Sequence, residues 1–351
     1  MSKCIAYIGT YSKGENGGIF RVEIDDQTGD LAVLDTLDVE NPSHLALSPD
    51  GKFLYAASET GKFRDQLGGA VAACAVDAQG KLSLLNMEGT EGVAPCYVAV
   101  APDGKFVYAA NYGQGTATVF AVDDQGRVCD HPKIVEHQGK GANPQRQERP
   151  HVHITRVTPD GKYLAVCDLG IDAVVLYPLC ATCGVDKNRG SFVRTPDGDG
   201  PRHIEFSKDG KYAYVVTEMG CTVRAYAYED GRMTFLSAIS TLPEDFDGQN
   251  IDAAIHFAPD GKTLVASNRG HDSLTLLDVD GGEMRVRQIV KVGGKTPREF
   301  AYTANGKFVF VCNQDSADIT VLAADEAGNL TLTDKKYDLP KPVCLFSETQ
   351  R

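Results

Sequence analysis

One hydrophobic pattern recurs along the chain and defines its expected architecture. Two short runs of alternating apolar residues flank an Asp-Gly turn, as in residues 202–218, RHIEFSKDGKYAYVVTE. Alternation with a period of two around such a turn predicts a β-hairpin. Related segments occupy residues 43–59, 96–112, 153–169, 253–269 and 298–314. A repeat of about 50 residues along a whole chain indicates stacked or radial repeats.

A second hairpin follows each first one, as in residues 116–130 (TATVFAVDDQGRVCD) and 320–333 (TVLAADEAGNLTLT). Each repeat is therefore expected to contain four short antiparallel strands. A degenerate copy at residues 173–188, AVVLYPLCATCGVDKN, has Cys180 and Cys183 in its turn. Seven second hairpins accompany only six complete first hairpins, so one first hairpin is missing from the continuous sequence.

The two ends of the chain supply the missing hairpin. Residues 341–348, KPVCLFSE, match an innermost strand, and residues 3–11, KCIAYIGTY, match the strand beside it. A seven-bladed β-propeller closes its ring in this way and leaves no open edge. We therefore predict an all-β fold with little helix, formed by residues 1–351 as a single domain. The absence of tryptophan excludes the Trp-Asp repeat type of propeller.

Composition and charge narrow the possible partners. The net charge is −13 and the sequence pI is about 5.1, with no basic patch, so nucleic-acid binding is not expected. No apolar run is long enough to cross a membrane, and the N-terminus lacks a signal-peptide pattern, which predicts a cytoplasmic protein. Most of the ten cysteines fall in apolar runs and are expected to be buried thiols. The Cys180–Cys183 pair lacks the further ligands or context that zinc or redox chemistry requires.

Polar residues gather at one end of each first hairpin. Residues eight before and eight after the turn glycine lie at the same end of an antiparallel hairpin, opposite the turn. In a propeller, that end surrounds the mouth of the central channel. The charged and imidazole side chains expected on this face are His153, Arg202, His203, Glu218, Arg269, Arg298 and Glu299.

Polar residues seven after the glycine have a simpler explanation, since they can bond neighbouring backbone; they are Thr10, Ser58, Asn111, Asp168, Thr217, Asn268 and Asn313. A single Arg–Glu pair at the mouth could be a structural ion pair between blades. Three arginines at one mouth need a further explanation, because charges near a low-dielectric channel are costly unless they are paired or bind a ligand. The pattern therefore predicts an anion-binding site.

A polar insert, residues 139–153 (GKGANPQRQERPHVH), precedes the third hairpin copy and is too long for a simple connector. Its His151 and His153 could form a metal pair, but no carboxylate or cysteine partner lies nearby in sequence. The Asp-Gly turns lack a complete calcium-loop pattern. No metal or other cofactor is therefore expected.

Several short motifs together resemble the seven-bladed propeller lactonase family, whose best-known type is 6-phosphogluconolactonase. They are RQERPHVH (146–153), GPRH (200–203), Glu218, SNRG (267–270) and PREF (297–300), and the resemblance extends from residue 7 to the final strand. It implies a cytosolic, metal-independent hydrolase that opens a sugar lactone of the pentose phosphate route. By similarity to the fungal carboxy-muconate lactonizing enzyme, the implied active-site residues are His153, Arg202, Glu218 and Arg269.

The resemblance suggests roles for these side chains in hydrolysing 6-phosphoglucono-1,5-lactone. His153 or Glu218 is expected to act as general base, with Arg202 facing the oxyanion. Arg269 and Arg298 are expected to hold phosphate or carboxylate. Further expected substrate contacts are His151, His203, Asn268, Gln147, Arg146 and Arg149, with His151 a rival of His153.

Three alternatives remain at this stage. The enzyme could act on another lactone or run the reverse lactonisation; it could use a metal bound by Asn111, Asp168 or Asn268; or it could be a non-catalytic propeller that binds a partner. The expected partner is a small phosphorylated sugar lactone, and the expected state is a monomer or weak homo-oligomer.

Overall fold

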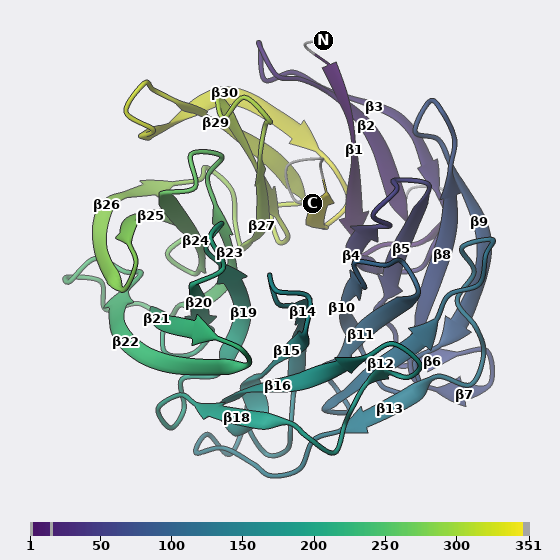
Figure 1. The fold of residues 1–351 in the computed structure, drawn as a ribbon. Helices are drawn as coiled ribbons and strands as arrows, with labels where there is room; N and C mark the ends of the chain where they lie inside the picture. Colours follow the sequence, from purple (N-terminus) through teal and green to yellow (C-terminus); the bar gives the residue numbers. More distant parts are fainter. Residues whose placement is uncertain (1–2, 15–16, 347–351) are drawn as a thin grey trace.

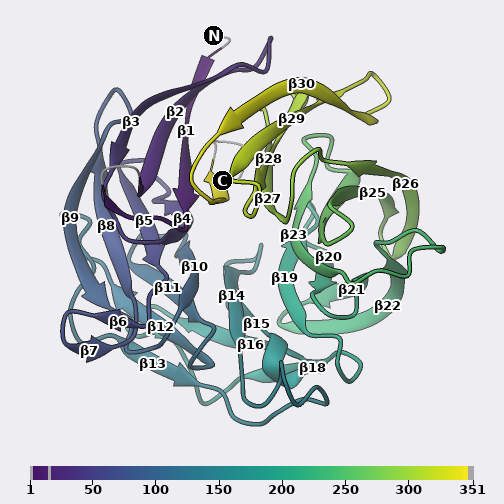
Figure 2. The ribbon, with the colours of Figure 1, turned by 180° about the vertical axis from the view of Figure 1, so that it is seen from behind.

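The computed structural model describes residues 3–14 and 17–346, so residues 1–2, 15–16 and 347–351 of the predicted 1–351 domain lie outside it. Seven β-sheets stand as blades around a central channel (Figures 1 and 2). The described residues contain no α-helix, and their 3₁₀ structure includes the short turn η2 (Leu169–Ile171). The predicted all-β propeller is confirmed. None of the described residues form a helix long and apolar enough to cross a membrane.

The closing blade joins the two ends of the chain. Its strands, from inside to outside, are β31 (Pro342–Phe346), β1 (Lys3–Thr10), β2 (Ile19–Asp25) and β3 (Leu31–Leu37). Strands β31 and β1 are antiparallel, with Tyr7 opposite Phe346 and Ile8 opposite Leu345. In Figure 1 the yellow end of the chain meets purple β1 at this sheet. The predicted closure by both termini is thus confirmed.

The next two blades follow in chain order. Blade two contains β4 (Pro42–Leu47), β5 (Phe53–Ser58), β8 (Ala70–Val76) and β9 (Leu82–Gly89), with a small hairpin of β6 (Lys62–Phe63) and β7 (Gln66–Leu67) in one loop. Blade three contains β10 (Pro95–Val100), β11 (Phe106–Asn111), β12 (Thr116–Ala121) and β13 (Lys133–Glu136).

Blade four is the degenerate copy. It contains β14 (Val152–Val157), β15 (Tyr163–Asp168) and β16 (Ala173–Cys180), and both β17 (Gly184–Val185) and β18 (Ser191–Arg194) pair with β16. Cys180 and Cys183 form a disulfide in its outer turn, whereas the other eight cysteines are free. This pairing was not predicted, because adjacent thiols in a turn carry no sequence signal for their oxidation state.

Blades five to seven are regular four-stranded units. Blade five contains β19 (Pro201–Phe206), β20 (Tyr212–Thr217), β21 (Thr222–Glu229) and β22 (Arg232–Ser240). Blade six contains β23 (Ile251–Phe257), β24 (Thr263–Arg269), β25 (Ser273–Asp280) and β26 (Glu283–Lys291). Blade seven contains β27 (Pro297–Tyr302), β28 (Phe308–Asn313), β29 (Asp318–Ala324) and β30 (Leu330–Asp338).

In blades two to seven, the Asp-Gly or Asn-Gly turn of the first hairpin is stabilised by its own side chains. In blade five, Ser207 Oγ donates to Asp209 Oδ1 at 2.6 Å, and the Lys211 amide donates to the same oxygen at 3.1 Å. Gly210 has φ of 69°, a left-handed conformation that favours glycine. Local hydrogen bonds and the glycine conformation therefore fix the turn end of this hairpin.

The polar residues seven after the turn glycine hold blades together internally. The Asn111 amide donates to Thr116 Oγ1 at 2.9 Å and Thr118 Oγ1 at 2.8 Å, and Asn313 repeats this contact with Asp318 and Thr320. All members of this set are buried. The position thus has a structural role, although Asn111 and Asn313 bond mainly side chains of the neighbouring strand and not the expected backbone.

A β-bulge begins the innermost strand of most blades. The pairing register shifts so that one residue is left over, namely Ser43, Cys96, His153, Arg202 or Arg298 in blades two, three, four, five and seven. In blade six the irregularity spans Ala253 and Ala254. Because a bulge re-aims a side chain, this position supplies the residues that meet at the channel mouth.

Candidate active site

Glu218 lies at the channel mouth and forms ion pairs with arginines from two blades and from the insert. Its Oε2 lies 3.0 Å from Arg202 Nε and 2.9 Å from Arg269 Nη2. Its Oε1 lies 2.5 Å from Nη2 of Arg146, a residue of the insert. Glu218 is 3 % exposed and Arg202 1 % exposed. The predicted proximity of Arg202 and Glu218 is confirmed, and both oxygens of Glu218 are occupied.

The ion pairs between Glu218 and its arginines shift the pKa values of these residues. Burial alone would raise the pKa of Glu218, but Arg269 and Arg202 hold it far below its usual range. Burial, together with the neighbouring Arg269 and Arg298, lowers the pKa of Arg202 to about 9. At neutral pH Glu218 is thus a carboxylate and Arg202 is still a cation. A carboxylate so strongly stabilised is a poor proton acceptor.

His153 lies beside this cluster as a neutral imidazole. Its Nε2 is 4.0 Å from Glu218 Oε2, and its Nδ1 is 3.7 Å from Cys96 Sγ. Burial and the Arg202 cation hold the pKa of His153 well below its usual value. His153 is therefore unprotonated at neutral pH, although its basicity is reduced.

His203 contacts Arg202 and holds its guanidinium in place. Arg202 Nη1 donates to His203 Nε2 at 3.1 Å and to the Ala253 carbonyl at 2.7 Å. Because a guanidinium can only donate, the proton of the His203 ring is on Nδ1. Burial and Arg202 keep the pKa of His203 well below its usual value. These contacts fix the Arg202 guanidinium, so His203 positions a neighbour in this structure.

A second group, Tyr11, Glu59 and Arg298, occupies the other side of the mouth. The Tyr11 hydroxyl donates to Glu59 Oε2 at 2.8 Å, and the Arg298 guanidinium lies 5.2 Å from the centre of the Tyr11 ring. Arg298 donates no side-chain hydrogen bond to any of the described residues. Burial opposes its charge, yet Tyr11, Glu59 and Glu218 raise the pKa of Arg298 above its usual value. Arg298 is therefore a cation with free donors.

His151 lies on the wall of the mouth, apart from Glu218. Its ring stacks on Tyr112, with 4.5 Å between ring centres, and its Nδ1 is 2.8 Å from the Tyr112 carbonyl. Its Nε2 is 3.3 Å from Glu148 Oε2. The Asp168 side chain accepts from the His151 amide at 2.7 Å and contacts His137 at the same distance. These contacts favour a role in holding the insert.

Two predicted substrate contacts, Gln147 and Asn268, lie in structural networks. The amide of Gln147 is fully buried and donates to the Leu169 carbonyl and to Asp172 Oδ1, both at 2.8 Å. The amide of Asn268 donates to Ser273 and Thr275 within its blade, both at 3.0 Å. We remove both residues from the proposed substrate contacts, because their donors already have partners away from Glu218.

Glu299 was expected at the channel mouth, but it pairs with His256 instead. It belongs to a set of channel residues that was not predicted from the sequence. Arg156, Glu205, His256 and Glu299 form an ion-pair chain across blades four to seven, which we call the channel belt. Both terminal nitrogens of Arg156 pair with Glu205 at 3.0 and 2.8 Å, and His256 bridges Glu205 at 3.0 Å and Glu299 at 2.7 Å. Arg156, Glu205 and His256 all stand five residues before a turn glycine, and this shared position was the available signal.

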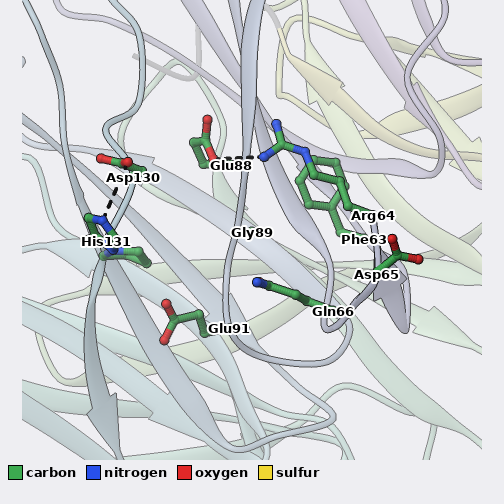
Figure 3. A pocket seen from close by; sticks show the side chains of 10 residues that line it. Phe63, Arg64, Asp65, Gln66, Glu88, Gly89, Glu91, Asp130 and His131 are labelled. Carbon is green, nitrogen blue, oxygen red and sulfur yellow. Dashed lines mark ion pairs between the residues drawn. The ribbon is translucent and has the colours of Figure 1, made fainter.

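The channel belt lines a cavity of about 500 Å³ at the turn end of the channel, to which all seven blades contribute. Its charged groups already neutralise one another, which favours a structural role. A separate surface pocket of about 340 Å³ lies over the outer strands of blades two and three (Figure 3). Its ion pairs, Arg64–Glu88 and Asp130–His131, are both 3.6 Å long. Exposed pairs of this kind contribute little energy and point to no ligand.

No cluster of three or more potential metal ligands of the His, Cys, Asp or Glu type occurs in the part of the chain that the structure describes. The proposed ligands Asn111, Asp168 and Asn268 bond within their own blades and the insert. The geometry therefore gives the metal alternative no support.

Comparison with known proteins connects this site to a family. The model of the family described as "Lactonase, 7-bladed beta-propeller" matches residues 5–346. The chain belongs to this family. The predicted family membership is thus confirmed, and the chain is a lactonase, that is, a carboxylic ester hydrolase.

Individual relatives of this lactonase cover nearly the whole chain. A Bacillus subtilis protein named 6-phosphogluconolactonase is 35% identical over 352 residues, covering 98% of each chain. The structure of a periplasmic gluconolactonase from Pseudomonas aeruginosa has a TM-score of 0.91 at 31% identity and covers 98% of this chain and 99% of that one. A protein structure from Lactobacillus plantarum has a TM-score of 0.88 at 33% identity and covers 98% of both chains.

Proposed function

We propose that this lactonase hydrolyses 6-phosphoglucono-1,5-lactone to 6-phosphogluconate in the pentose phosphate pathway. The observation that carries the proposal is the unbalanced charge of the mouth. Four guanidiniums, of Arg146, Arg202, Arg269 and Arg298, face two carboxylates, of Glu218 and Glu59. An excess of buried cations is costly without an anion, and a phosphate dianion matches it.

Arg298 is the best candidate for the phosphate, because its guanidinium has no hydrogen-bond acceptor among the described residues. Arg269 contributes a second donor, since its Nε is buried without a partner. Planar guanidiniums suit the paired oxygens of a phosphate. The substrate phosphate is therefore proposed to lie between blades six and seven.

Arg202 is proposed to stabilise the oxyanion that forms when water attacks the lactone carbonyl. Its guanidinium is fixed by Glu218, His203 and the Ala253 carbonyl, so it needs no rearrangement during the reaction. A preorganised cation at the developing negative charge is a large catalytic term. In this proposal Glu218 orients the arginines, and it is not the base.

The proposal extends to the setting of the reaction. The B. subtilis relative bears the name of the phosphorylated-lactone enzyme. We propose that this protein acts in the cytoplasm, as a monomer or weak homo-oligomer, and that it needs no cofactor. Cell fractionation and light scattering test the first two of these statements.

The function is tested with freshly generated 6-phosphogluconolactone, whose hydrolysis is followed against the spontaneous rate. Unphosphorylated gluconolactone is the comparison substrate. We expect the protein to accelerate hydrolysis of the phosphorylated lactone and to show at least a tenfold lower kcat/KM with the unphosphorylated one. Removing the phosphate contact through Arg298→Met should abolish this preference. Equal rates for both lactones would contradict the phosphate assignment, and no acceleration of either would contradict the function.

A further inference from the structure

Neither of the two residues predicted from the sequence to act as general base, Glu218 and His153, is well suited to that role. Both oxygens of Glu218 receive guanidinium donors, at 2.5, 2.9 and 3.0 Å. His153 is neutral, but burial beside Arg202 weakens it as a proton acceptor. General-base catalysis works best when the acceptor holds a proton readily near the working pH. A different group in the mouth should therefore be considered.

Glu59 is a second carboxylate at the mouth. It follows β5 in blade two, eight residues after the turn glycine Gly51, and so occupies the position that Glu218 has in blade five. The Tyr11 hydroxyl holds its Oε2 at 2.8 Å. Its Oε1 accepts no hydrogen bond from the described residues, and the residue is only half-buried. Glu59 therefore combines a fixed orientation with one free oxygen, whereas both oxygens of Glu218 are taken.

Glu59 is also coupled to the cations of the site. Arg298 lies against the ring of Tyr11, whose hydroxyl holds Glu59, and both Glu59 and Glu218 stabilise the Arg298 cation. The thiol of Cys96, which lies 3.7 Å from His153, is under the electrostatic influence of Glu59, Arg298 and Arg202. A substrate bound through Arg298 would therefore lie beside the Tyr11–Glu59 pair.

We propose that Glu59 is the general base of the lactonase reaction and that Tyr11 is its positioning residue. This inference rests on the proposed function. Glu59 takes a proton from water as the water oxygen bonds to the lactone carbonyl carbon. The resulting oxyanion faces Arg202. When the tetrahedral intermediate collapses, the bond from this carbon to the ring oxygen breaks, and Glu59 returns the proton to that oxygen. The products are the hydroxyl and the carboxylic acid, which then ionises to solvent.

The experiment compares Glu59→Gln with Glu59→Ala and with the wild type. Glutamine keeps an oxygen that accepts from Tyr11 but cannot take a proton, whereas alanine removes the contact as well. We expect Glu59→Gln to lower kcat about 10²–10⁴-fold. Its KM, its melting temperature and its affinity for 6-phosphogluconate by calorimetry should stay close to those of the wild type. Glu40→Gln, at an exposed glutamate of the preceding connector that pairs with Lys13, is the matched control and should behave as wild type.

Tyr11→Phe gives an independent readout because it keeps the ring against Arg298 and removes only the hydroxyl. Without this hydroxyl the Glu59 carboxylate is no longer held in one orientation, so kcat should fall while KM stays close to the wild-type value. A purely structural Tyr11–Glu59 contact would instead lower the melting temperature and leave kcat of the folded variant unchanged.

The outcomes separate the two proposals. If the wild type accelerates lactone hydrolysis and Glu59→Gln retains more than a tenth of its kcat, Glu59 is not the base. If the wild type fails to accelerate any lactone tested, the proposed function falls, whatever the variant does. A variant that binds 6-phosphogluconate normally and turns over no substrate supports both.

Discussion

At the scale of single residues, the site consists of one carboxylate that organises three guanidiniums. Spacing alone placed Arg202 and Glu218 together, because antiparallel pairing is symmetric about the turn glycine and both stand eight residues from Gly210. The same spacing argument could not show which of the neighbours Asn268 and Arg269 has its side chain at the mouth. Successive side chains of a strand point to opposite faces, so Asn268 bonds within its blade while Arg269 reaches the mouth.

Replacing Glu218 by Gln should damage both stability and activity. The substitution leaves Arg202 and Arg269 without their shared countercharge in a nearly water-free site, and unbalancing a buried ion pair typically costs about 3–5 kcal/mol. We expect a loss of this size in urea denaturation at pH 7, together with the loss of lactonase activity. Glu244→Gln, at an exposed position, serves as the control. An unchanged free energy of unfolding would show that the arginines do not depend on Glu218.

The pH dependence of this contribution has a definite sign. The folded-state pKa of Glu218 is depressed, so its stabilisation is present above the unfolded value of about 4.3 and is lost as the pH falls towards the folded value. The difference in unfolding free energy between wild type and Glu218→Gln should therefore be constant near neutral pH and shrink only under acidic conditions.

At the scale of elements, the bulges and the insert position the chemistry. The repeat pattern predicted where each innermost strand begins, but the bulge that re-aims Arg202 or Arg298 depends on the pairing register, which hydrophobic alternation does not specify. The insert has no periodicity at all, so the sequence could not distinguish Arg146, which reaches Glu218, from the neighbouring Gln147, which is buried among Leu169 and Asp172.

Arg146 is the most accessible cation of the cluster and comes from the insert rather than from a blade. Its side chain is 36% exposed, against 4% for its partner Glu218. Arg146→Ala should therefore raise KM roughly 10-fold, the loss of about one charge-assisted hydrogen bond, with little change in kcat or melting temperature. Arg149→Ala is the matched control. Arg149 was also expected to contact substrate, but its side chain is 58% exposed and, among the described residues, pairs only with the exposed Glu148 of the same insert. An equal effect of both variants would exclude a specific contact of Arg146 with substrate.

At the scale of the whole molecule, ring closure was predictable because the strand patterns at the two ends of the chain complement each other. The structure pairs β31 with β1 as expected. A variant that ends after Leu339 would lack β31 and expose the inner edge of β1. We expect it to lose cooperative thermal unfolding or to aggregate, as an unpaired edge strand promotes. A truncated protein with the wild-type melting transition would contradict the importance of this closure.

The only sequence signal for the channel belt was the shared position of Arg156, Glu205 and His256 five residues before a turn glycine, because each occurs alone within an apolar run. Only the ring geometry brings side chains from four blades into one chain of contacts. Burial alone would lower the pKa of His256, but Glu299 and Glu205 raise it to about 10. The imidazolium therefore links blades five, six and seven, and this link depends on pH.

The channel belt should stabilise the protein less in alkaline solution than at neutral pH. The folded-state pKa of His256 is above its unfolded value of about 6.5, so its stabilisation is complete below pH 6.5 and is lost as the pH rises to about 10. Over this window the wild type should lose on the order of 3 kcal/mol of unfolding free energy through this group. His256→Gln has no such titration, so it should be less stable than wild type at pH 6.5 and approach it near pH 10.

Urea denaturation at several pH values measures this convergence, and the comparison cancels the buried thiols and phenols that titrate in both proteins. His131→Gln is the control, because the His131 side chain is 93% exposed and lies outside the channel. Its unfolding curve should follow that of the wild type at every pH. A constant gap between wild type and His256→Gln from pH 6.5 to 10 would mean that His256 is neutral in the folded protein. The belt would then be held by hydrogen bonds to an uncharged ring rather than by an imidazolium between two carboxylates.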